Sequence, residues 1–109
     1  MQQIQIIGVR DLDEMEIESI NRIANRHYQK IQRELKNDIS IKLHIKSHKK
    51  EGKQKKYSMH VKVITPTRTF ASTKAFDWKL ENALHKSFTD VMKIIQHSLH
   101  TDNQHKKTY

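Results

Sequence analysis

The sequence predicts one α+β domain with the element order β-α-β-β-β-α, in which two helices cover one face of a four-stranded sheet. Apolar residues recur at helical spacing in two segments, from Ile17 to Leu35 and from Leu80 to Leu99. Between these segments the period changes to two, because apolar and polar residues alternate over residues 39–46 and 57–63. We expect an antiparallel sheet whose apolar face is covered by both helices and whose other face is open to solvent.

The first strand and the first helix have clear local signals. Residues 3–9 contain four β-branched apolar residues, which predicts a short strand that is closed by Gly8 and Arg10. Asp13 is a good helix N-cap, and Glu16 stands three residues later, where the partner in a capping box belongs. The helical spacing predicts that this helix ends near Lys36.

The remaining elements follow from turn residues and period. Residues 47–56 are polar and contain Gly52, which predicts a β-hairpin with a long tip. Pro66 ends the second hairpin strand, residues 67–72 are the expected fourth strand, and the second helix is expected from about Asp77. Residues 1–100 then form the domain, and residues 101–109 are expected to be a polar, disordered tail.

Composition restricts the class of protein. The chain of 109 residues has no apolar run approaching the roughly 20 residues needed to cross a bilayer, so no membrane association is expected. Its first residues lack the features of a signal peptide. The absence of cysteine excludes disulfides and thiolate metal sites. These features predict a cytoplasmic protein.

Charge is distributed unevenly along the chain. There are 21 Lys and Arg against 12 Asp and Glu, a formal net charge of +9. Five of those acidic residues lie within residues 11–18, where carboxylates in the first turn complement the helix dipole. The rest of the chain carries 21 basic and 7 acidic residues, and a field of that sign attracts polyanions. A basic surface that serves only solubility is the alternative.

Basic residues form a row on each predicted helix. A projection at 100° per residue places the four cations of the first helix in one stripe opposite its apolar face. In the second helix three lysines recur every seven residues beside the core face. If both helices cover one sheet face, the two rows point outward on the same side of the molecule, which suits phosphates. The predicted RNA-binding residues of the helices are Arg22, Arg26, Lys30, Arg33, Lys79, Lys86 and Lys93.

The hairpin tip is a third basic element. It contains one acidic residue, Glu51, among many lysines, and a flexible loop of this kind can reach into a groove and neutralise phosphates. A charged edge that prevents strand aggregation is the alternative. The predicted RNA-binding lysines of the tip are Lys49, Lys50, Lys53, Lys55 and Lys56, with Lys46 beside them.

The open face of the predicted sheet carries Lys42, His44, Lys46, His60 and Lys62. Single-strand RNA modules stack bases on aromatic residues of such a face, but Tyr57 falls on the apolar side of the alternation, so no aromatic platform is expected. Trp78 either covers the edge of the core or stacks on a base, and we favour the first.

Neither catalysis nor metal binding is predicted. The eight histidines include the pair His44 and His60, which the hairpin brings together, but no spacing fixes a third ligand. The chain has only two glycines and no phosphate-binding loop, and capping explains most of its carboxylates. We therefore expect no enzyme and no cofactor.

The layout resembles the ribosome hibernation promoting factors, also called ribosomal subunit interface or protein Y proteins. The resemblance covers about residues 3–99 and rests on the opening strand Ile4–Gly8, the capped basic first helix, the alternating hairpin, and Phe70-Ala71-Ser72 followed by a helix near Asp77. It implies that the protein binds small-subunit rRNA in the mRNA–tRNA channel and inhibits translation under stress. It also implies the short form of the family, monomeric off the ribosome.

Two other functions use the same surface. Double-stranded-RNA-binding domains run α-β-β-β-α, so an added leading strand gives the present order; their basic patch at the second helix would here be only Lys74 and Lys79. A scaffold protein whose cationic face binds an acidic protein partner is the second alternative, and it predicts weak RNA binding.

Overall fold

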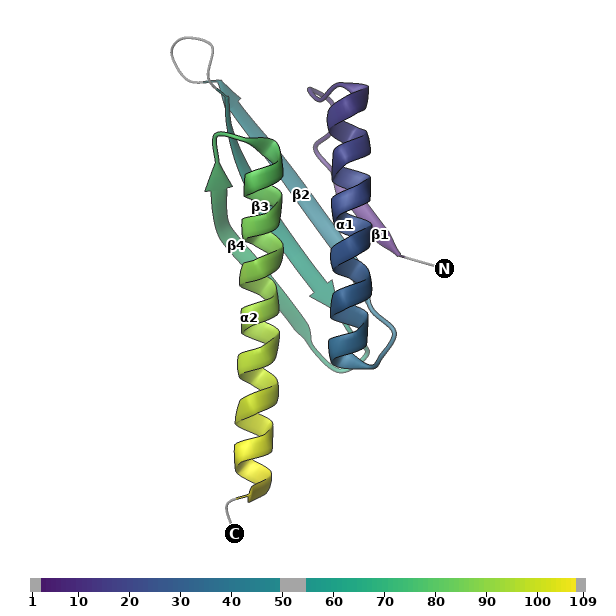
Figure 1. Cartoon of the computed structure of the whole chain (residues 1–109), viewed down its shortest axis with the longest axis vertical. Coiled ribbons are helices and arrows are strands. Elements are labelled where there is room, and N and C mark those ends of the chain that lie inside the picture. Colours follow the sequence, from purple (N-terminus) through teal and green to yellow (C-terminus); the bar gives the residue numbers. More distant parts are fainter. Residues whose placement is uncertain (1–2, 50–54, 108–109) are drawn as a thin grey trace.

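Two helices pack side by side on one face of a four-stranded sheet, and the opposite sheet face is uncovered (Figure 1). The computed structural model describes the backbone of residues 3–49 and 55–107 and the side chains of residues 3–48 and 55–100. The predicted α+β class and the order β-α-β-β-β-α are confirmed. The elements are β1 (Ile4–Ile7), α1 (Glu14–Leu35), β2 (Ser40–Lys49), β3 (Lys55–Ile64), β4 (Thr69–Asp77) and α2 (Leu80–Lys107).

The sheet has the order β1-β2-β3-β4 and is mixed. The expectation of an antiparallel sheet is wrong for β1, which pairs parallel to β2, whereas β2–β3 and β3–β4 are antiparallel. The reason is the connection: α1 carries the chain back along the sheet, so β2 starts from the same end as β1. Gly8 ends β1 with φ +94°, and a Cβ there would collide with the backbone carbonyl of Ile45.

The core lies between the sheet and the helices. Alternate residues of β2 and β3 point toward the helices, as the period of two predicted. The Tyr28 hydroxyl of α1 donates a buried hydrogen bond of 3.0 Å to the Ile39 carbonyl, so α1 is tied to the start of β2. The buried apolar residues of α1, β2 and β3 are Ile20, Ile23, Ala24, Tyr28, Ile31, Ile39, Ile41, Leu43, Ile45, Tyr57, Met59, Val61 and Val63. Those of β4 and α2 are Phe70, Leu80, Ala83, Leu84, Phe88, Val91 and Ile95.

The predicted capping box of α1 is confirmed. The Asp13 carboxylate accepts a hydrogen bond of 2.8 Å from the Glu16 amide, and Glu16 accepts one of 3.1 Å from the Asp13 amide. Lys36 caps the other end in a left-handed conformation, where its amide donates to the Gln32 carbonyl. These caps fix α1 between residues 14 and 35, close to the predicted limits.

Strand β4 and helix α2 depart from the predicted limits. β4 extends to Asp77 instead of ending at Ser72, and α2 begins at Leu80. Helix α2 continues to Lys107, beyond Leu99, the last apolar residue of its helical spacing. No Gly or Pro follows Leu99, and adding residues to an existing helix costs little compared with nucleating one.

A β-bulge changes the orientation of the second half of β4. Val61 pairs with Ser72 and Met59 pairs with Ala75, so β4 has one residue more than β3 between these pairs. A shift of one residue moves the following side chains to the opposite face of the sheet. Phe76 consequently lies opposite Ser58, on the face turned away from the helices.

No helix in the described part of the chain is both long and apolar enough to span a membrane.

Candidate RNA-binding surfaces

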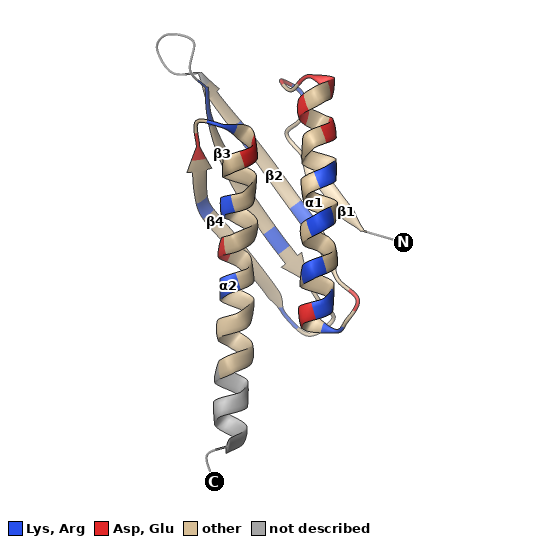
Figure 2. Ribbon diagram, viewed as in Figure 1, with Lys and Arg blue, Asp and Glu red and all other residues tan. Residues whose placement is uncertain are grey.

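The basic row of α1 has the predicted geometry. Arg22, Arg26, Lys30 and Arg33 are all exposed, while the opposite side of the helix is buried against the sheet. The capping box holds the acidic residues in the first turn, so they do not alternate with the cations. Figure 2 shows acidic residues at the start of α1 and basic residues along most of the rest of it, with an acidic residue again near its end, where Glu34 follows Arg33.

The middle of this row carries uncompensated charge. Arg22 at one end forms an ion pair of 3.7 Å with Glu81 of α2, and both side chains remain more than half exposed. The Arg33 guanidinium at the other end contacts the Gln29 carbonyl at 3.5 Å. Among the described side chains, no carboxylate lies within 4.0 Å of Arg26 or Lys30. These two cations are therefore available to an anionic ligand.

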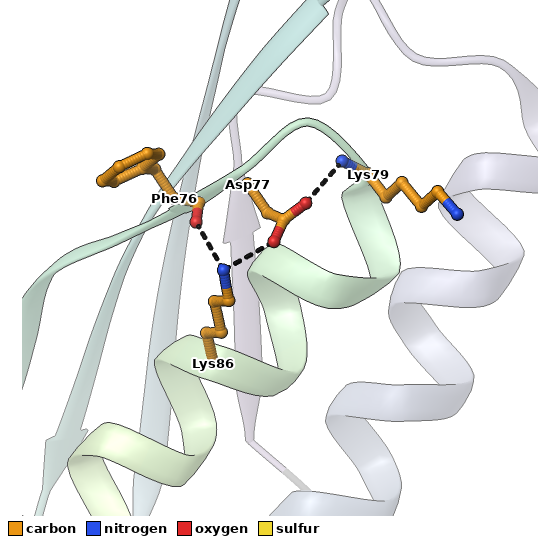
Figure 3. A network of polar contacts seen from close by, with 4 residues as sticks. All are labelled: Phe76, Asp77, Lys79 and Lys86. Carbon is orange, nitrogen blue, oxygen red and sulfur yellow. Dashed lines mark hydrogen bonds and ion pairs between the residues drawn. The ribbon is translucent and has the colours of Figure 1, made fainter.

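The basic row of α2 is largely compensated. The Lys86 ammonium lies 2.6 Å from the Asp77 carboxylate and 3.5 Å from the Phe76 carbonyl, as Figure 3 shows. The hydrogen bond from Lys86 to the Asp77 carboxylate lowers the pKa of Asp77, and the hydrogen bond from the Lys79 amide lowers it further. Lys79 lines a groove that also contains Asp13, Glu16 and Glu81. Local acidic groups thus reduce the positive field at two of the three lysines.

The two rows do not form one continuous surface. Lys86 and Lys93 line a groove of about 480 Å³ with Lys74 of β4, on the side of α2 that faces β4. The α1 row lies across the other side of α2, where Arg22 contacts Glu81. Both helices cover the same sheet face, and Lys86 and Lys93 lie on the β4 side of α2, away from the α1 row.

Two histidines lie between the rows. The His27 Nε2 and His85 Nδ1 atoms are 3.1 Å apart, and the His27 ring stacks on Phe88 at 4.6 Å. Burial, then the charges of His85, Lys30 and Arg26, lower the pKa of His27 to about 4. His27 is therefore neutral at pH 7, and it contributes packing rather than charge to this region.

The lysines predicted in the hairpin tip belong mostly to strands. Lys49 is the last residue of β2, and Lys55 and Lys56 begin β3, because the ladder extends further than the alternation of apolar residues suggested. Lys50 and Lys53 lie outside the described residues. The expectation of a ten-residue flexible tip is wrong at both of its ends.

The open face of the sheet carries the predicted cations and one group that was missed. His44 and His60 are cross-strand partners with ring centroids 6.3 Å apart, and Lys42 lies opposite Lys62, as the alternation predicted. The bulge adds Phe76, whose side chain is 48% exposed. Strict alternation from Phe70 would place Phe76 toward the helices, and no glycine marks the bulge, so the sequence held no signal for it.

Trp78, which we favoured as a cover for the edge of the core, is 47% exposed. Within residues 3–48 and 55–100, no group of three or more His, Asp or Glu residues is arranged to hold a metal ion.

Sequence comparison identifies no relatives: no known family model matches the chain, and no curated protein matches it at a significant level.

Proposed function

We propose that the protein binds RNA through the exposed cations of α1. The observation that carries this proposal is that Arg26 and Lys30 are both exposed and have no carboxylate within 4.0 Å among the described side chains. Phosphate contacts supply most of the affinity in sequence-independent RNA binding. Lys and Arg at this spacing suit the phosphates of an RNA backbone that runs along α1. Arg33 extends the row, and Arg22 contributes when it exchanges Glu81 for a phosphate.

The RNA we propose is small-subunit rRNA in the mRNA–tRNA channel, so the protein would be a cytoplasmic, ribosome-associated inhibitor of translation. The support is the resemblance to hibernation factors, together with a β-α-β-β-β-α fold that carries both helices on one sheet face. A small domain of this kind excludes mRNA and tRNA by occupancy and needs no catalytic group.

The geometry favours this function over the two alternatives. Double-stranded-RNA-binding modules use a basic patch at the start of the second helix, but here Lys79 shares its groove with three carboxylates. Stable protein interfaces have a mostly apolar centre. The cations of the α1 row have no exposed apolar residues between them, so the row is poorly suited to an acidic protein partner.

Sedimentation through sucrose gradients tests the proposal. The protein should travel with small subunits or whole ribosomes at low salt and should inhibit translation in vitro. The variant Arg26→Glu/Lys30→Glu should stay at the top of the gradient, with an unchanged circular dichroism spectrum because both side chains are exposed. Wild-type protein found only in free fractions would refute the ribosomal function, and a preference for bare RNA duplex over ribosomes would favour the double-stranded-RNA alternative.

A further inference from the structure

The uncovered sheet face has one sign of charge. Its central residues come from β2 and β3, with Phe76 from β4 beside them. None of the described residues on this face is acidic, and its lysines reach solvent. A surface that serves solubility alone would mix charges of both signs. The name open sheet face is used for the part of the uncovered face formed by Lys42, His44, Lys46, His48, Lys56, Ser58, His60, Lys62 and Phe76; Gln5 and Ile7 of β1 lie beside Lys42 and His44.

The lysines of this face are placed where they oppose folding. Lys42 and Lys62 are direct cross-strand partners. Like charges directly opposite each other destabilise a strand pair. Lysines on edge strands prevent aggregation, but β1 pairs with β2 at Lys42 and β4 pairs with β3 at Lys62, so that explanation does not apply to this pair. A polyanion bound across the face would remove the repulsion.

An exposed aromatic ring lies at the hairpin end of this charged face. The Phe76 ring projects away from α2 (Figure 3), and the Lys56 ammonium lies 4.2 Å from its centroid. The ring is 48% exposed, and it shares the face with Ser58 and the cations of β2. An aromatic ring beside a cation offers stacking to a base and a charge to the adjoining phosphate.

We propose that the open sheet face binds single-stranded RNA, with one base stacked on Phe76 and the phosphates held by Lys56, Lys46, Lys42 and Lys62. This site is on the opposite side of the sheet from α1, so one molecule can contact structured RNA and an unpaired strand at once. The choice of RNA over single-stranded DNA rests on the proposed function, whereas the assignment of a single-strand site to this face does not depend on it.

Charge and shape select this ligand. A duplex keeps its bases stacked inside, so it would contact the lysines and leave Phe76 unused. An acidic peptide satisfies the cations but has no flat ring to stack on Phe76. Between Phe76, which lies opposite Ser58, and the Lys42–Lys62 pair, the face follows β3 for about four residues, or roughly 13 Å, which fits a few nucleotides of extended strand.

Fluorescence anisotropy with a labelled oligouridine of about ten nucleotides tests the site on the full chain. Lys42→Gln/Lys62→Gln should weaken binding about 25-fold at roughly 0.1 M salt, because each phosphate contact to a single strand contributes about 0.7 to the salt slope. Phe76→Ala should weaken it about fivefold or more, and Phe76→Tyr should keep the affinity because the ring remains. All these side chains are at least partly exposed, and thermal melting confirms that each variant is folded.

The matched comparison is Arg26→Gln/Lys30→Gln, which removes the same charge from the helix side. It should lose ribosome binding and keep oligouridine affinity within about threefold, since long-range attraction falls only slightly. Oligouridine binding that depends on α1 and not on the sheet would overturn the inference. So would equal affinity for a poly-glutamate peptide, or a Phe76→Ala variant that binds like wild type. If the wild type misses ribosomes but binds oligouridine through the sheet, the proposed function fails and this site stands.

Discussion

Replacing Arg26 and Lys30 together by glutamine removes the two α1 cations that have no acidic neighbour among the described side chains. Glutamine keeps the length and the helix propensity of the side chains, so the change is confined to charge. With about six phosphate contacts in all, the slope of log affinity against log salt should be near −5 for the wild type. Losing two contacts should change that slope to about −3.6 and weaken binding about 60-fold at roughly 0.1 M salt.

The assay is binding of purified small subunits at several salt concentrations, with affinity taken from pelleting or fluorescence. The control is Arg10→Gln/Lys74→Gln, which lowers the net charge equally at two exposed positions outside the α1 row and the open sheet face. It should leave the slope for small subunits within about one unit of the wild type. Equal losses in the two double variants would mean that net charge, rather than the α1 row, controls binding, and the reasoning would be refuted.

Three further predictions concern stability. Gly8→Ala should lower the free energy of unfolding by about 3 kcal/mol or more, because it combines a positive φ with a collision at Ile45, and an unchanged urea midpoint would contradict this. Asp13→Ala should cost about 1 kcal/mol through loss of the capping box, measured in the same way, and a cost near zero would mean the cap is dispensable. Stability should also fall as the pH is lowered from 6.5 to 5. The pKa of His27 is about 6.5 in the unfolded chain and about 4 in the folded protein, so the unfolded state binds more protons in this interval. Allowing for solvent screening, the loss should be roughly 1 kcal/mol, and His27→Gln should remove that part; an equal loss in this variant would contradict the assignment.

Features decided by neighbouring residues were predictable. The Asp13–Glu16 capping box needs only a spacing of three, and the pairing of His44 with His60 needs only the period of the two hairpin strands. Helix α1 and the exposure of its basic row follow from helical geometry alone. In each case the partners lie within one element or one hairpin.

Features decided by packing between elements were not predictable. The bulge that turns Phe76 outward exists because β4 must pair with β3 and also reach α2, and no single residue signals it. The compensation of Lys86 depends on Asp77, which periodicity assigned to the second helix but which ends β4. The orientation of α2 on the sheet likewise decided that Lys86 and Lys93 face β4, whereas Lys79 lies in a groove with the start of α1.

The most direct test of the proposed function is chemical footprinting of small-subunit rRNA with and without the protein. If α1 binds rRNA in the mRNA–tRNA channel, nucleotides lining that channel should be protected by the wild type and become reactive again with Arg26→Gln/Lys30→Gln. Absence of protection at saturating protein, or protection confined to rRNA outside the channel, would contradict the account.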